Sequence, residues 1–377
     1  MPAKNDLRSA VGQLLIMGFD GSELSARVKT CISTLQPGGV ILFARNISGP
    51  AQTHALLRDC QKLVHVPMFL CVDMEGGTVD RLKNMIASAP AAADVFATGD
   101  KGMFRAHGRL IGEEVRALGF NTDFAPVFDL ALPASRAVLT SRTVSAEPEQ
   151  VVSYAREFLA GLREQGVLGC GKHFPGLGEA SLDSHHQLPV IRKNWERLWE
   201  EDLYPYRALR RQIPFAMVAH AAFPEVTGNG TPASLSHKWI SEILRKQIGY
   251  RGLVISDDLD MAGVLAAGSV EHAAVETMRA GADIFLVCRN EEHVWRSYQA
   301  VLQEAERDKA FARLVTRAAG RVLAFKRKSA KILRSKSSAP SASQIDELRR
   351  RMTDFQEELT ARLQVPGEKR QLTTAAP

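Results

Sequence analysis

The segment GKHFPGLGEASLDSHHQLPV (residues 171–190) contains side chains that could carry out acid–base chemistry. Lys172 and His173 end an apolar run, a Gly/Pro-rich turn follows, and Asp183 then precedes His185 by two residues. In a tight loop, an aspartate at this spacing can hold the imidazole in one tautomer and stabilise its cation, as a carboxylate does for a catalytic histidine. Adjacent histidines could also be a surface feature or half of a metal site, but the sequence has no partner ligands at a suitable spacing.

A second candidate group lies in RGLVISDDLDMAGV (residues 251–264), where an apolar run ends in two carboxylates. A carboxylate at the end of a strand can act as a nucleophile, a base or a metal ligand. Successive side chains on a strand point in different directions, so Asp257 and Asp258 are expected to have different tasks. Alternatively, Asp258 caps the following helix and Asp257 is a structural hydrogen-bond acceptor.

The third candidate group is VDMEGGTVDRL (residues 72–82). Asp73 ends an apolar run, Gly76 and Gly77 allow a bend with close backbone approach, and Arg81 follows. A carboxylate and an arginine together often bind adjacent sugar hydroxyls or a sugar-linked acid, because both groups form strong hydrogen bonds. By itself, this pattern is a weak indicator of carbohydrate binding.

Eight short apolar runs could position these groups. They alternate with helix-compatible segments, which predicts right-handed parallel βαβ units. Eight such units in roughly 300 residues favour a single (β/α)8 TIM-like barrel, an α/β fold, over an open doubly wound sheet. The runs are residues 13–20, 39–46, 68–73, 122–130, 168–174, 215–220, 252–258 and 283–290.

Nearly every run ends in a polar residue. The carboxyl ends of barrel strands meet around one mouth, where enzymes of this fold carry their active sites. A single polar strand end usually caps the next helix, whereas eight together indicate a lined pocket. The residues are Asp20, Arg45, Asn46, Asp73, Asp129, Lys172, His173, His220, Asp257, Asp258, Arg289 and Asn290.

The motifs KHFPG-x-G…DSHHxLP, DxEGG…RL, GGxILFxRN, DFAPVxD and SDDLxM together resemble those of glycoside hydrolase family 3. Within that family they are similar to the bacterial β-N-acetylhexosaminidase subgroup, which removes terminal N-acetylglucosamine. The resemblance runs from about Leu14 to Phe325. It implies an exo-acting, retaining hydrolase that needs no metal or organic cofactor and that acts on carbohydrate, with peptidoglycan fragments as the expected substrate.

The resemblance also implies a role for individual residues. Asp257 corresponds to the nucleophile that forms a covalent glycosyl-enzyme, and Asp183 and His185 correspond to the acid/base dyad. Retaining hydrolysis needs a nucleophile and a proton donor on opposite faces of the anomeric carbon. An imidazole with a pKa near ~6.5 can serve both as acid and as base at neutral pH. The expected glycone-binding set is Asp73, Arg81, Arg142, Lys172 and His173.

This chain departs from the family pattern at two positions. Leu177 stands where the family commonly has a second histidine, and Thr78 stands where an arginine is usual. Neither change touches the dyad or the nucleophile, so activity is expected to survive. The block around Arg142 (SRTVS) matches weakly, and the C-terminal region is too short and too polar for the sandwich domain of many family members.

The formal net charge of +6 lies in the C-terminal region. Residues 326–377 hold twelve Lys or Arg and six Asp or Glu, so the first 325 residues are formally neutral, which suits an uncharged sugar and argues against nucleic acid as a partner. We expect a barrel over 1–325, a basic Ser/Ala/Pro-rich linker over 326–343, an amphipathic helix over 344–364 and a disordered tail over 365–377. The helix could dock on the barrel or join copies of the chain in a homo-oligomer.

The composition excludes several other classes of protein. With 45% hydrophobic and 24% charged residues the chain is globular, and no run approaches the ~20 apolar residues of a membrane span. The N-terminal segment lacks the apolar core and cleavage site of a signal peptide, and five scattered cysteines without C-x-x-C suit a reducing cytoplasm.

Three alternative functions stay open at this point. A family-3 β-glucosidase or xylosidase is disfavoured by the DSHH motif, because relatives without it take their acid/base carboxylate from elsewhere. A sugar-binding protein without activity is disfavoured by the intact Asp257, Asp183 and His185. A β-N-acetylglucosaminide phosphorylase could use the same residues, because a neutral histidine repels an anionic acceptor less than a carboxylate would.

Overall fold

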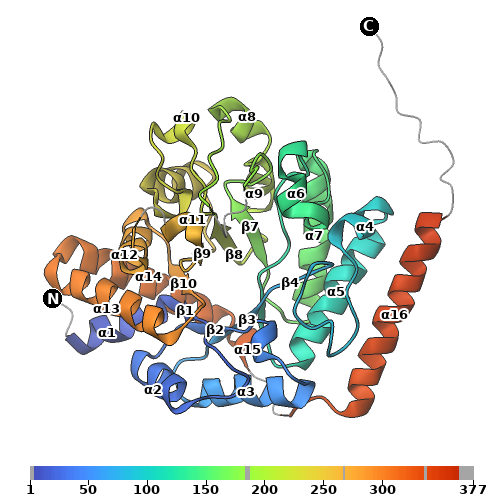
Figure 1. The fold of residues 1–377 in the computed structure, drawn as a ribbon, viewed down its shortest axis with the longest axis horizontal. Helices are drawn as coiled ribbons and strands as arrows, with labels where there is room; N and C mark the ends of the chain where they lie inside the picture. The colour runs from blue at the N-terminus through green and yellow to red at the C-terminus, as the bar shows by residue number, and fades with distance from the viewer. Residues whose placement is uncertain (1–3, 183–186, 266–267, 335–337, 365–377) are drawn as a thin grey trace, which may run out of the picture.

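Eight parallel strands form the central sheet in the part of the chain that the structure, a computed structural model, describes: residues 4–182, 187–265, 268–334 and 338–364 (Figure 1). Each predicted apolar run contains one strand. Most of their residues are buried, as expected for parallel strands covered on both faces. The strands are β1 (Leu15–Met17), β2 (Gly39–Ile41), β3 (Phe69–Val72), β6 (Thr122–Asp123), β7 (Cys170–Phe174), β8 (Phe215–Val218), β9 (Leu253–Asp258) and β10 (Ile284–Val287).

The sheet closes into a barrel. Its hydrogen-bonded order is β6-β3-β2-β1-β10-β9-β8-β7. The two end strands are joined by parallel bridges from Thr122 to Leu168 and from Val127 to Lys172. The predicted (β/α)8 barrel is therefore confirmed, and the open doubly wound sheet is the wrong alternative.

A helix follows each barrel strand before the next one begins, and these helices surround the sheet (Figure 1). They are α2 (Ala26–Leu35), α3 (Pro50–Lys62), α5 (Lys101–Ala117), α7 (Pro148–Glu164), α9 (Tyr204–Leu209), a helix over Lys238–Gln247, α12 (Val270–Ala280) and α13 (Glu291–Arg307). Further helices are α1 (Lys4–Gln13), α4 (Ala92–Ala97), α6 (Arg136–Leu139), α8 (Trp195–Glu200), α10 (Pro224–Thr227), α11 (Ala262–Leu265), α14 (Lys309–Lys328), α15 (Ala330–Leu333) and α16 (Ala342–Gln364). In this described part of the chain, no helix is long and apolar enough to cross a membrane.

Some of the polar residues at the strand ends make structural hydrogen bonds and do not line a pocket. Asn290 caps α13, with its Oδ1 accepting from the backbone N of His293 at 2.9 Å. Asn46 is fully buried, and its amide donates to the carbonyl groups of Phe19 at 2.9 Å and Gly21 at 2.8 Å. The expectation that these two residues line a pocket is wrong, because Asn290 caps a helix and Asn46 satisfies backbone carbonyl groups just after β1.

A short antiparallel hairpin, β4 (Met74–Gly76) and β5 (Val79–Asp80), follows β3 and was not predicted. Gly76 has a φ of 82°, and a Cβ atom there would lie 2.0 Å from the carbonyl oxygen of Pro90. Only glycine fits this close approach. The hairpin turns the chain so that the segment after β3 lies over the barrel mouth.

The barrel extends beyond Phe325, since α14 runs to Lys328. Lys326 is 3% exposed, and its Nζ donates to Gln13 Oε1 and to the carbonyl of Gly38, both at 2.8 Å. Gln13 and Gly38 precede β1 and β2, so Lys326 lies at the amino-terminal end of the barrel. The predicted start of the linker at residue 326 falls inside this helix, and one of the counted tail cations is a buried barrel residue.

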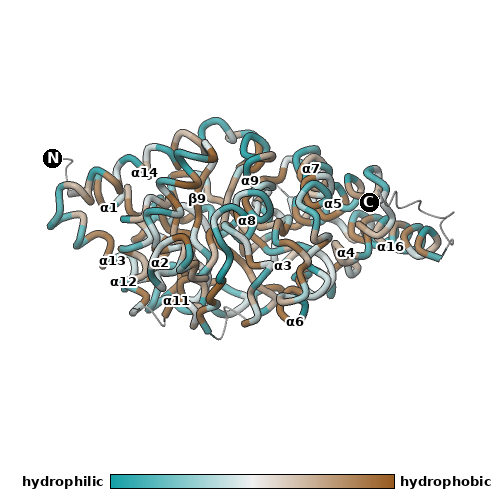
Figure 2. Tube along the Cα trace, turned by 90° about the horizontal axis from the view of Figure 1, so that it is seen from above, coloured by the Kyte–Doolittle hydropathy of each residue, from teal (hydrophilic) through white to brown (hydrophobic). Residues whose placement is uncertain are grey.

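Helix α16 packs on the chain's own barrel. Both views place it at the edge of the molecule, beside α4 and α5 (Figures 1 and 2). Its apolar face is buried there, with Met352 fully covered and Phe355 and Leu359 each 5% exposed. Docking on the barrel, the first of the two alternatives, is what the structure shows. A homo-oligomer through α16 would have to use its outer, charged face and stays a prediction.

Candidate active site

One pocket lies at the carboxyl ends of the barrel strands and brings together most of the predicted site residues. Strands β3, β7 and β9 supply groups from separate parts of the barrel, as expected for this fold. The predicted residues that line it are Asp73, Arg81, Arg142, Lys172, His173 and Asp257. Asp183 and His185 lie outside the described residues.

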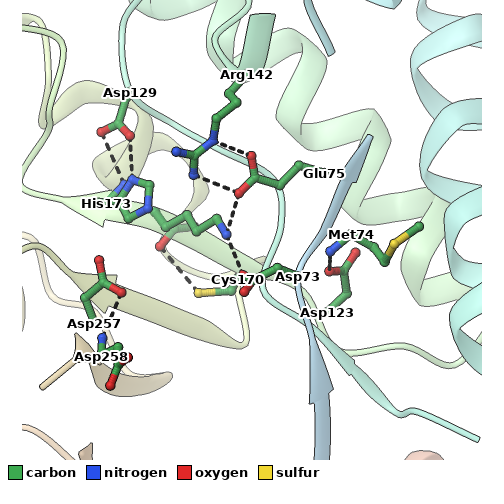
Figure 3. A network of polar contacts seen from close by, with 12 residues as sticks. Asp73, Met74, Glu75, Asp123, Asp129, Arg142, Cys170, His173, Asp257 and Asp258 are labelled. Atoms are coloured by element: carbon green, nitrogen blue, oxygen red, sulfur yellow. Dashed lines mark hydrogen bonds and ion pairs between the residues drawn. The ribbon is translucent and has the colours of Figure 1, made fainter. Parts of the chain in front are cut away.

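Two carboxylates and two cations form a continuous network on one side of the pocket (Figure 3). Lys172 Nζ lies 2.8 Å from Asp73 Oδ1 and 2.6 Å from Glu75 Oε1. Arg142 donates two hydrogen bonds to the same glutamate, from Nε to Oε2 at 2.7 Å and from Nη2 to Oε1 at 2.9 Å. The four charges cancel, so the network has no net charge and still offers hydrogen-bond donors and acceptors to a ligand.

Glu75 is the centre of this network, and sequence reasoning missed its role. Its side chain is 2% exposed. Burial alone would raise the pKa of this carboxyl, but the adjacent charges of Arg142 and Lys172 outweigh it and hold the pKa well below its ordinary value. The spacing of Glu75 and Asp73 could have indicated this role. Side chains two residues apart in an extended segment point the same way, so Glu75 is expected to lie beside Asp73.

The same neighbours keep the two cations charged. Burial would lower the pKa of Lys172, but Asp73 and Glu75 raise it above its ordinary value. Burial would likewise lower the pKa of Arg142, and Glu75 raises it. The weakly matched block around Arg142 therefore places a guanidinium at the pocket, held by a buried partner.

His173 is oriented by Asp129, a residue that the sequence indicated only as a polar strand end. Asp129 Oδ2 lies 2.7 Å from His173 Nδ1, and Oδ1 accepts from the backbone N of His173 at 3.2 Å and of Leu177 at 2.8 Å. With Nδ1 donating to the carboxylate, Nε2 is the nitrogen that can accept from a ligand when the ring carries one proton. Leu177, at one of the two departures from the family pattern, is itself part of the pocket wall.

Strand β9 ends in the two adjacent carboxylates, which the structure puts to different uses. Both line the pocket, and Asp257 Oδ1 accepts from the backbone N of Asp258 at 2.8 Å. Asp258 turns toward the next strand, where its Oδ1 accepts from the backbone N of Asp260 and of Cys288, both at 3.0 Å. Burial, with Asp260 and Asp257 nearby, raises the pKa of Asp258 to about 7.

His220 forms a hydrogen bond with the backbone at the end of β9. The imidazole is fully buried, and its Nε2 lies 2.9 Å from the carbonyl oxygen of Asp258, so this nitrogen donates. Its Nδ1 then accepts from the hydroxyl of Ser234 at 2.7 Å. Burial lowers the pKa of His220, which keeps the ring neutral in this arrangement. This strand-end histidine therefore has a structural task that fixes the backbone next to Asp257.

Arg81 reaches the pocket from the segment after the β4–β5 hairpin. Its guanidinium carbon lies 5.9 Å from the ring centre of Phe43, another pocket residue. Its Nε is buried and has no hydrogen-bond partner among the described residues. A buried donor without a partner in the wall of a pocket is suited to a ligand oxygen.

Within the described ranges, no group of three or more His, Cys, Asp or Glu side chains could hold a metal ion. The carboxylates of the pocket have protein partners instead: Asp73 pairs with Lys172, and Glu75 pairs with Lys172 and Arg142. The chemistry that the arrangement offers is that of a carboxylate beside a neutral, polar binding surface.

Comparisons with known proteins agree with this arrangement. The model of the glycosyl hydrolase family 3 N-terminal domain matches residues 6–325. A beta-hexosaminidase of Alkalilimnicola ehrlichii is 38% identical over 287 residues, which cover 74% of this chain and 82% of that protein. A beta-hexosaminidase of Bordetella avium is 38% identical over 276 residues, covering 71% of this chain and 78% of that protein.

Solved structures show the same relationship. A family 3 β-N-acetylglucosaminidase from Paenibacillus superposes with a TM-score of 0.86 and 33% identity, over 93% of this chain and 68% of that one. A β-N-acetylhexosaminidase from Beutenbergia cavernae superposes with a TM-score of 0.78 and 29% identity, over 85% of this chain and 98% of that one. The chain therefore belongs to glycosyl hydrolase family 3, as its motifs predict, and is a glycoside hydrolase.

Proposed function

We propose that this protein is an exo-acting, retaining β-N-acetylglucosaminidase that removes terminal N-acetylglucosamine from β-linked glycoconjugates. The observation that carries the proposal is that one pocket contains both the Asp257 carboxylate and the network of Asp73, Glu75, Arg142 and Lys172. The names of the similar proteins, beta-hexosaminidase and β-N-acetylglucosaminidase, support N-acetylglucosamine as the glycone.

The pocket suits an uncharged sugar. Lys172 and Arg142 are each paired with a carboxylate, so their charges are already balanced before a ligand arrives. Hydroxyl groups can donate to Asp73 and accept from Lys172 or from the unpartnered Nε of Arg81. In the network each cation already has a carboxylate partner, and the carboxylate of Asp257 offsets the charge of Arg81 in the same pocket. A pocket without surplus positive charge favours water over phosphate as the second substrate.

In the proposed reaction, a carboxylate oxygen of Asp257 attacks the anomeric carbon and forms a glycosyl ester. The glycosidic carbon–oxygen bond breaks, and the departing oxygen takes a proton from His185. Water then attacks the same carbon, gives a proton to His185 and releases Asp257, so that the configuration is retained. Asp183 stabilises the imidazolium before it donates. The roles of His185 and Asp183 rest on the DSHH motif.

We further propose peptidoglycan fragments as the natural substrate and the cytoplasm as the location. The substrate follows from the resemblance to the bacterial subgroup. The location is supported by the cysteines, because all five are buried free thiols, which suits a reducing compartment.

The test is the turnover of a panel of 4-nitrophenyl β-glycosides of N-acetylglucosamine, N-acetylgalactosamine, glucose and xylose, each with and without inorganic phosphate. The proposal predicts that the N-acetylglucosaminide is cleaved fastest, to the free sugar, with no dependence on phosphate. Preference for the glucoside or xyloside would contradict the glycone, and formation of a sugar 1-phosphate would contradict hydrolysis.

A further inference from the structure

Helix α16 lies outside the residues that match the family model, yet it contacts the segment that carries Arg81 into the pocket. Residues 81–91 form neither a helix nor a strand, so their backbone groups need partners from elsewhere. Some of these partners are side chains of α16. Arg349 donates from Nε to the carbonyl of Ile86 at 3.1 Å and from Nη2 to the carbonyl of Met85 at 3.3 Å. Gln356 donates to the carbonyl of Ser88.

The inner side of the same segment is tied to the hairpin. Asp80 accepts from the backbone N of Leu82 and of Ala89, both at 2.8 Å, and the backbone N of Gly77 donates to the carbonyl of Ala89 at 2.9 Å. Arg81 therefore sits in a closed loop. Asp80 holds this loop from the barrel side, and α16 holds it from the outside.

A second line of contacts runs from α16 to the backbone beside Glu75. The ring of Phe355 stacks on His107 of α5, with 6.0 Å between ring centres and 17° between planes. His107 is fully buried, and its Nδ1 lies 2.9 Å from the hydroxyl of Tyr154. Its Nε2 lies 3.1 Å from the point where a Cβ of Gly76 would be. His107 thus lies close to the turn next to Glu75.

Ion pairs fix where α16 lies along the barrel. Arg351 pairs with Glu113 of α5, and Arg362 Nη1 lies 2.7 Å from Asp100 Oδ2 at the start of α5. These pairs place Arg349 and Gln356 opposite the carbonyl groups of residues 85–88. The neighbouring Arg350 has no such task, because its ion-pair partners among the described residues are Glu347 and Asp354 of its own helix.

We propose that α16 is a positioning element of the active site, in which Arg349 and Gln356 hold the 81–91 loop so that Arg81 stays in its substrate-binding position. The inference rests on the proposed function, since it takes Arg81 as a glycone-binding residue. Asp257, the proposed nucleophile, lies on β9, whereas the hydrogen bonds of Arg349 and Gln356 to the loop reach residues 85–88. Loosening α16 should therefore weaken substrate binding much more than it slows the chemical steps.

The test compares Arg349→Ala with Arg350→Ala in the full-length protein, and Gln356→Ala with Glu357→Ala as a second matched pair. Arg349→Ala should raise KM for 4-nitrophenyl N-acetyl-β-glucosaminide about threefold to tenfold, the value of one or two hydrogen bonds. Its kcat should stay within about twofold, and Arg350→Ala should leave both constants unchanged. Arg349→Lys, which keeps a donor and the charge, should restore part of the loss.

Hydrogen–deuterium exchange provides a readout that does not depend on turnover. In Arg349→Ala and Gln356→Ala, amide exchange should rise in residues 81–91 and stay unchanged in β9. Equal exchange of this loop in the Arg349 and Arg350 variants would overturn the inference, as would a fall in kcat without a rise in KM. If the wild-type protein did not cleave the N-acetylglucosaminide, the proposed function would fail, and the exchange comparison alone would decide whether α16 holds the loop.

Discussion

Arg142 and Glu75 form a bidentate ion pair in the wall of the pocket, with 2.7 Å from Nε to Oε2 and 2.9 Å from Nη2 to Oε1. Glu75 also accepts from Lys172, so a single buried carboxylate orients two cations that face the ligand. The residue is not expected to touch the reacting atoms. Its task is to fix the positions of groups that contact the sugar.

Replacement of Glu75 should therefore affect both binding and stability. Glu75→Gln keeps the shape but leaves the buried Arg142 without a charged partner, while Lys172 keeps Asp73, and this should lower the free energy of unfolding by about 3–5 kcal/mol. KM should rise at least tenfold, because Arg142 loses its bidentate partner. Denaturant unfolding and steady-state kinetics measure the two effects, with the exposed Glu200→Gln as the matched control. Unchanged KM in Glu75→Gln would show that Arg142 and Lys172 do not need this carboxylate to bind the sugar.

Replacement of Asp129 should change which nitrogen of His173 carries the proton. In Asp129→Asn, an amide N–H₂ group can replace Oδ2 and would donate to Nδ1, so that Nε2 becomes the protonated nitrogen and can no longer accept from a ligand hydroxyl. The loss of a hydrogen bond to a charged group should lower kcat/KM by about 10- to 100-fold without unfolding the protein. The measurement is kcat/KM together with the melting temperature. Retained activity in Asp129→Asn would contradict a role of Asp129 in setting the tautomer of His173. A loss of activity that is explained by unfolding alone would contradict it as well.

The buried Lys326 should make stability depend on pH. Burial lowers its pKa to about 7 in the folded protein, whereas an unfolded lysine titrates near ~10.4. Between these values the unfolded chain binds more protons, so this group makes the free energy of unfolding rise with pH, by at most about 1.4 kcal/mol per pH unit. Below pH 7 the folded protein has to bury the charge.

The matched variant for this effect is Lys326→Met, which keeps the length of the side chain and removes the charge. Relative to this variant, the wild type should gain stability as pH rises from 7 to 9. The measurement is denaturant unfolding of both proteins at each pH. A difference between the two proteins that does not change with pH would show that Lys326 keeps an ordinary pKa.

The sequence was sufficient for the barrel, because buried parallel strands are continuous apolar runs that recur at regular spacing. It was also sufficient to bring Asp73, Lys172, His173 and Asp257 to one mouth, because strand ends meet there in a closed barrel. The hairpin over Met74–Asp80 was not predictable in the same way. Barrel strands of similar length lie inside longer apolar runs, whereas β4 (MEG) and β5 (VD) each include an acidic residue and lie outside such a run.

Other features depend on contacts between distant parts of the chain, which no local pattern reveals. Asn46 and Asp73 both follow apolar runs, yet the first is a buried structural amide and the second a pocket carboxylate. In the sequence, Lys326 belongs to a basic segment that predicts a linker. Its hydrogen bonds to Gln13 and Gly38, which are distant in the sequence, are what make it part of the barrel. The periodicity of α16 predicts an apolar face, but it does not say that the chain's own barrel covers it.

The central claim is that Asp257 forms the covalent intermediate, and trapping that intermediate tests it most directly. The wild-type protein would be incubated with a 5-fluoro-N-acetylglucosaminyl fluoride, which slows release of the sugar, and then digested for peptide mass spectrometry. The peptide that contains Asp257 should carry one fluorinated N-acetylglucosaminyl group, fragmentation should place that group on Asp257, and Asp257→Ala should show no adduct and no turnover. An adduct on another residue, or full turnover by Asp257→Ala, would contradict the mechanism.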